Sequence, residues 1–92
     1  MKKEDLDNLE QFMNMDGADQ LEELGFEIDE YNGYTYWLLV IDNRHSAHLF
    51  INYIHGYIIL EINLETIWRK DRLDTFEEFK IAFEQLRTFL TT

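Results

Sequence analysis

The chain has 92 residues, 46% apolar and 15% aromatic, which is enough for one domain (residues 1–92) with its own hydrophobic core. It contains no cysteine, and this excludes a disulfide framework, thiolate catalysis and a zinc site of the cysteine type. Its net charge of −11 argues against direct binding to nucleic acid or to an anionic membrane, because both carry negative charge themselves.

The N-terminal segment, residues 4–24, predicts one helix or a pair of short helices. Apolar side chains recur at helical spacing at Leu6, Leu9, Phe12 and Met13, and again at Ala18, Leu21 and Leu24. We expect Asp16–Gly17 to break or bend the helix, and Gly25 to take the left-handed position that follows a helix end. The first residues lack the apolar run of a signal peptide, and no stretch reaches the roughly 20 apolar residues of a membrane span. We therefore expect a cytoplasmic protein.

Residues 26–41 predict a β-hairpin, because Asn32–Gly33 favours a type I′ turn with positive φ at both central positions. A two-residue loop pairs Tyr31 with Tyr34 and Ile28 with Trp37. One face of this hairpin, expected to meet the helices, carries Phe26, Ile28, Trp37, Leu39 and Ile41. The opposite face carries Glu27, Asp29, Tyr31, Tyr34, Tyr36, Leu38 and Val40.

A second hairpin is expected over residues 46–63, with its turn at His55–Gly56. Its more apolar face carries Ala47, Leu49, Ile51, Tyr53, Ile58, Leu60 and Ile62. Since a slip of one residue exchanges the two faces of a strand, this face can join the Trp37 face only through an odd-length loop or a bulge near residues 42–45.

Residues 64–73 are expected to form a connector that holds Arg69, Lys70 and Arg72. A final helix then begins at a capping box made by Thr75 or Asp74 with Glu78 or Glu77. Its apolar stripe comprises Phe76, Phe79, Ala82, Phe83, Leu86 and Leu90. The prediction is an α+β fold of two layers, with an N-terminal helix or helix pair, a four-stranded antiparallel sheet of two hairpins, and a C-terminal helix.

The residue types of a catalytic triad gather near Asp42, where His45 and His48 flank Ser46, the only serine. So close a group on a turn and strand cannot readily align nucleophile, base and orienting acid, so we interpret it as a polar turn. The three histidines are separated along the strands, and Glu27 with Asp29 is interpreted as a solvated strand face. We expect no catalytic residues, no metal site and no cofactor.

Negative charge is concentrated in the first half of the chain. Twelve acids and no lysine or arginine lie between Glu4 and Asn43, whereas acids and bases nearly balance from Arg44 onward. A basic partner protein would be attracted to this charge, and the tyrosines of the hairpin supply contact area at low entropic cost. The predicted partner-binding residues are Asp19, Glu22, Glu23, Glu27, Asp29, Glu30, Tyr31, Tyr34 and Tyr36.

With its acidic stretch Glu4–Asp42, including LEELGFEIDEYNGYTYW at 21–37, the chain resembles the small phage-encoded anti-CRISPR and DNA-mimic proteins. The resemblance implies an inhibitor that occupies the nucleic-acid-binding site of a basic partner such as a CRISPR nuclease. Three alternatives stay open. One is an immunity protein or antitoxin for a basic toxin, another is a homodimeric structural or regulatory domain joined through the tyrosine face, and the third is a small enzyme.

Overall fold

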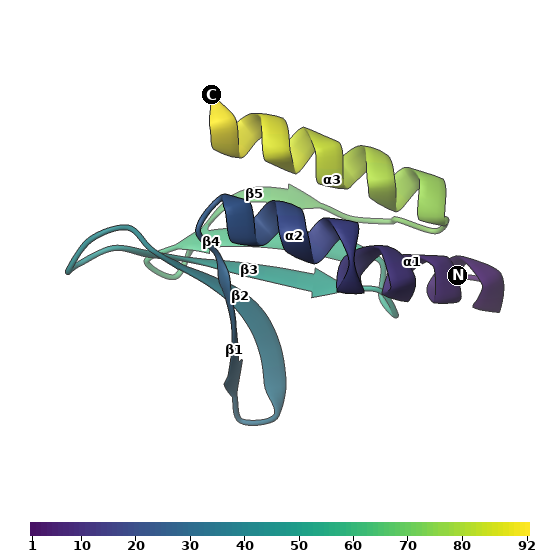
Figure 1. Cartoon of the computed structure of the whole chain (residues 1–92), viewed down its shortest axis with the longest axis horizontal. Helices are drawn as coiled ribbons and strands as arrows, with labels where there is room; N and C mark the ends of the chain where they lie inside the picture. The colour runs from purple at the N-terminus through teal and green to yellow at the C-terminus, as the bar shows by residue number, and fades with distance from the viewer.

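The computed structural model describes all residues from Met1 to Thr92. Its elements, in chain order, are α1 (Lys3–Asn14), α2 (Asp16–Glu23), β1 (Glu27–Tyr31), β2 (Tyr34–Val40), β3 (Ser46–Asn52), β4 (Tyr57–Ile62), β5 (Glu65–Lys70) and α3 (Phe76–Thr91). The strands form one antiparallel sheet in the order β1-β2-β3-β4-β5. Figure 1 shows α1 and α2 running end to end beside α3, while the β1–β2 hairpin extends away from them. The two-layer α+β prediction is confirmed.

The N-terminal segment is a helix pair. The break falls at Met15, whose φ of −122° and ψ of −91° interrupt the helical backbone. Gly17, expected to cause the break, lies inside α2, where an added Cβ would come within 2.8 Å of the Met13 sulfur. The helix ends as predicted at Gly25, with φ of +99°. The amides of Gly25 and Phe26 donate to the carbonyls of Glu22 and Leu21, a Schellman ending that buries Phe26.

The register of the first hairpin agrees with the sequence pattern. Tyr31 pairs with Tyr34 and Ile28 with Trp37, as expected from the Asn32–Gly33 turn. The turn of the second hairpin is longer than the expected His55–Gly56, because β3 ends at Asn52, which pairs with Tyr57 across residues 53–56. The link between the hairpins confirms the prediction that an odd-length loop or a bulge near residues 42–45 joins the two apolar faces. Val40 pairs with Ser46 across residues 41–45, a loop of odd length that puts Leu39 opposite Ala47 on the helix-facing side.

The core lies between the helices and strands β3 and β4, with Phe26 and Leu73 completing it. Its buried residues form one cluster: Leu9, Met13, Leu21, Phe26, Ala47, Leu49, Ile58, Leu60, Leu73, Phe79, Ala82, Phe83 and Leu86. Thr75 caps α3 as predicted, since its hydroxyl oxygen accepts from the Glu78 amide at 3.1 Å. Asp5 of α1 accepts the Phe76 amide at 3.1 Å and so ties the N-terminal helix to the start of the C-terminal one.

The expected connector at 64–73 is wrong in part, because its first half is a fifth strand. β5 pairs with β4 through a two-residue turn at Asn63–Leu64, with a register shift between Leu60 and Glu61. Both turn residues have positive φ, 51° and 69°. Such a turn normally carries glycine second, and a left-handed leucine is a strained exception, so the sequence rule for hairpins passes over it.

The expectation that the whole Trp37 face of the first hairpin meets the helices is wrong at two positions. Ile28 is 64% exposed and Ile41 is 51% exposed, although both lie on the predicted face. The reason is the extent of the helical layer, which covers β3 and β4 while the hairpin extends past it (Figure 1). All five residues of β1 are exposed.

Candidate protein-binding surface

The nine predicted partner-binding residues fall into separate groups in the structure. Tyr31, Tyr34 and Tyr36 line one groove on the sheet face that the helices leave uncovered. Glu22 and Glu27 line a different depression, at the corner where α2 meets β1. The other four, Asp19, Glu23, Asp29 and Glu30, are exposed and line neither. The predicted acids are therefore spread over α2 and the whole of β1, and Asp29 is the one that is hydrogen-bonded to a tyrosine.

We call the first hollow the aromatic groove. It is open to solvent, has a volume of about 370 Å³, and is walled by the three hairpin tyrosines. Its other residues are His48, Phe50, Glu61 and Leu64, from β3, β4 and the β4–β5 turn. Tyr31, Tyr34 and Leu64 are 70%, 76% and 83% exposed, so the rim is unpacked apolar surface.

Three rings pack against one another in the aromatic groove. Tyr36 meets His48 edge-on, with centroids 5.2 Å apart, and lies 5.8 Å from the Phe50 ring at a tilt of 36°. The His48 and Phe50 centroids are 6.3 Å apart. These separations are those of favourable aromatic pairs, so the rings hold one another in place before any partner binds.

Asp29 fixes the outer side of the hairpin. One carboxylate oxygen accepts the Tyr36 hydroxyl at 3.0 Å, and this bond raises the pKa of Tyr36. The other oxygen accepts the Glu30 amide at 2.8 Å. Because Tyr31 and Tyr34 close the hairpin, the Glu30 amide points away from β2, toward the free edge of the sheet. Asp29 thus occupies an edge donor that would otherwise be available for pairing with another strand.

Few of the carboxylates have a cationic partner. The only ion pairs join Asp42 to His45 and Asp71 to Arg69. Glu61, half-buried in the aromatic groove, makes neither an ion pair nor a side-chain hydrogen bond. The negative field of the hairpin is therefore uncompensated within the molecule.

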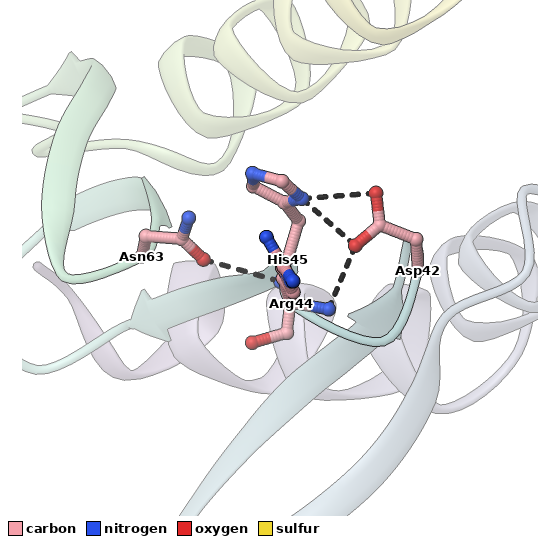
Figure 2. A network of polar contacts seen from close by, with 5 residues as sticks. Asp42, Arg44, His45 and Asn63 are labelled. Atoms are coloured by element: carbon pink, nitrogen blue, oxygen red, sulfur yellow. Dashed lines mark hydrogen bonds and ion pairs between the residues drawn. The ribbon is translucent and has the colours of Figure 1, made fainter.

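Of the residues with triad chemistry, Asp42 and His45 lie in the loop that joins the hairpins (Figure 2), whereas Ser46 and His48 belong to β3. Asp42 oxygens lie 2.8 and 2.9 Å from Nδ1 of His45, and one of them accepts the Arg44 amide at 2.8 Å. The bonds from Arg44 and His45 hold the pKa of Asp42 below its usual range. Ser46 donates its amide to Asn63 at 3.4 Å, and its hydroxyl makes no hydrogen bond to the imidazole. The contacts stabilise a turn and anchor it to the β4–β5 turn.

Sequence reasoning named the three tyrosines but missed His48, Glu61 and Leu64 as part of the same groove. The signal for the first two was the register of the second hairpin, in which His48 pairs with Glu61 on the side opposite the core. Leu64 could not be found this way, because its turn was expected to be part of a connector. No three His, Asp or Glu side chains converge as metal ligands would.

Comparison of the chain with known protein families, curated proteins and solved structures finds no match. None of the helices combines the length and the apolar character that crossing a membrane requires. The candidate surface therefore rests on its own geometry and charge.

Proposed function

We propose that this protein is a non-enzymatic binding module that inhibits a basic partner by occupying its nucleic-acid-binding site. A CRISPR nuclease or another host defence protein is the kind of partner meant. The observation that carries the proposal is the uncompensated carboxylate charge around the hairpin, beside exposed tyrosines. Neither ion pair involves an acid of α2 or β1.

The spacing of the carboxylates supports the proposal. Glu27 and Asp29 lie on one side of a single strand, roughly 6.6–6.8 Å apart from the strand rise. Such a row presents repeated negative charge to a partner, as the backbone of a nucleic acid strand does. The hairpin extends beyond the helices (Figure 1), so a cleft in a partner can receive it from several sides.

Affinity capture with competition by DNA tests this function. The protein is immobilised and exposed to bacterial and phage-infected lysates at about 50 mM salt, where phosphate-type contacts are strong. We expect the retained proteins to bind nucleic acid, to be displaced by a short DNA duplex, and to be lost at about 200 mM salt.

A charge-matched pair of variants locates the surface. E27Q/D29N removes two charges from the hairpin, and E4Q/D7N removes two exposed charges from α1 as the control. We expect the first to lose most of the capture and the second to keep it. Equal capture by both variants would contradict the assignment to the hairpin. A partner that the duplex fails to displace would instead indicate neutralisation of a basic toxin at another site.

The bare aromatic groove favours a second candidate, a homodimer joined through the tyrosine face. Sedimentation at several protein concentrations distinguishes the two, because a dimer forms without any partner. A concentration-dependent mass that Tyr34→Ala reduces would support the dimer.

A further inference from the structure

The position of Glu61 indicates a more specific interaction than general charge attraction. This half-buried residue lines the aromatic groove with Tyr36, His48 and Phe50, and its carboxylate has no counter-charge. His48, its cross-strand neighbour, is the one groove residue that can carry positive charge, and only when protonated. A carboxylate without a counter-charge in the molecule is available to pair with a cation that a partner supplies.

The groove walls select the kind of cation. Aromatic faces attract a cation through the ring quadrupole, and a planar guanidinium also stacks on them. A carboxylate accepts two parallel hydrogen bonds from a guanidinium, whereas an ammonium offers only a point charge. Rings and a carboxylate in one hollow therefore suit arginine better than lysine.

Leu64 adds a further indication that the groove has a use. It takes a φ of +69°, which is costly for a branched side chain, and is nonetheless 83% exposed at the groove rim. A glycine would relieve the strain but would remove the apolar rim. The leucine contributes no core packing in exchange.

We propose that the aromatic groove binds an arginine side chain of the basic partner protein, with Glu61 pairing the guanidinium and the tyrosine rings stacking against it. This inference rests on the proposed function, of which it names the recognition chemistry. A second copy of the chain is a poorer occupant, because each copy carries a net charge of −11 and would bring more carboxylates to the same face.

Two peptides of equal charge, nona-arginine and nona-lysine, test the proposal by titration calorimetry at low salt and pH 7.5. We expect nona-arginine to bind about fivefold more tightly, the gain of one cation–π contact. Glu61→Gln and Tyr34→Ala should each remove most of that preference. Tyr34→Phe, which keeps the ring, should retain it. Glu84→Gln, which removes an equal charge from the exposed side of α3, should leave it unchanged.

Equal affinity for the two peptides would overturn the arginine site while leaving the proposed inhibition intact, because DNA competition measures that function separately. An equal loss of preference in Glu84→Gln and Glu61→Gln would overturn the site as well, since the effect would then be one of total charge. A dimer in sedimentation that Tyr34→Ala dissociates would also overturn it, by assigning the groove to a second copy. Circular dichroism of each variant confirms that it is folded.

Discussion

The two hairpins share an alternation of apolar residues along their strands but lie in different surroundings. In β3 and β4 the helix-facing residues Ala47, Leu49, Ile58 and Leu60 are fully or almost fully buried. In β1 every residue is exposed, and Ile28 occupies the equivalent face without cover. Alternating apolar residues thus stabilise the fold in one hairpin and remain at the surface in the other. A hairpin that contributes little to the core is free to carry a binding surface.

The largest expected difference between the two hairpins is that between Leu49→Ala and Ile28→Ala. Leu49 is fully buried on β3, so its truncation should lower the free energy of unfolding by about 2–5 kcal/mol. Ile28→Ala should change it by about 0.5 kcal/mol or less. Urea denaturation measures both values. A loss at Ile28 as large as that at Leu49 would show that the hairpin is part of the core.

The two turn glycines sharpen the contrast at the backbone. Gly56 has φ of +67°, and an added Cβ would lie 2.5 Å from the Leu73 carbonyl oxygen. Gly33 has φ of +82° with nothing within 4 Å. Gly33→Ala should therefore lower the free energy of unfolding only by the strain of a left-handed alanine, about 1–2 kcal/mol. Gly56→Ala should lower it clearly more. Thermal unfolding of both variants checks the order, and equal costs would contradict the close packing at Gly56.

Leu64→Gly should stabilise the protein, which is unusual for the loss of a leucine. The left-handed backbone at this turn costs a leucine about 1–2 kcal/mol and costs glycine little, and no buried contact is lost. We expect the midpoint of urea unfolding to rise. A fall would show that Leu64 packs against the hairpin across the groove.

Asp29→Ala should loosen the outer side of the hairpin with only a small loss of stability, about 1 kcal/mol or less. It frees the Glu30 amide and the Tyr36 hydroxyl from their shared acceptor. Amide hydrogen exchange by NMR should become faster at Glu30 and stay unchanged in β4. Unchanged exchange at Glu30 would show that Asp29 does not protect the edge amide.

The smallest effect concerns the loop between the two hairpins. Hydrogen bonds from Arg44 and His45 lower the pKa of Asp42. A lowered pKa means that these contacts are fully present above the usual range of an aspartate and are lost as pH falls through the lower, folded value. The Arg44 amide shift in an NMR titration should follow this transition, and Asp42→Asn should abolish it. A midpoint at or above the usual aspartate range would contradict the contact.

Much of the fold follows from local rules that act on short stretches of sequence. Asn32–Gly33 determines the register of the first hairpin, and Gly25 ends α2, because few residues tolerate positive φ. The odd loop at 41–45 follows from the two-residue period of a strand. The outer face of the first hairpin, with its tyrosines and acids, is fixed by the same register.

Other features depend on contacts between distant parts of the chain. β5 forms although Leu64 violates the turn rule, because pairing with β4 compensates for a strained residue. Ile28 and Leu49 follow the same pattern, and only the reach of the helical layer leaves one exposed and the other buried. The aromatic groove likewise needs the sheet to bring Glu61 and Leu64 beside the hairpin tyrosines. Periodicity determines the face on which a side chain lies, whereas tertiary packing determines what covers that face.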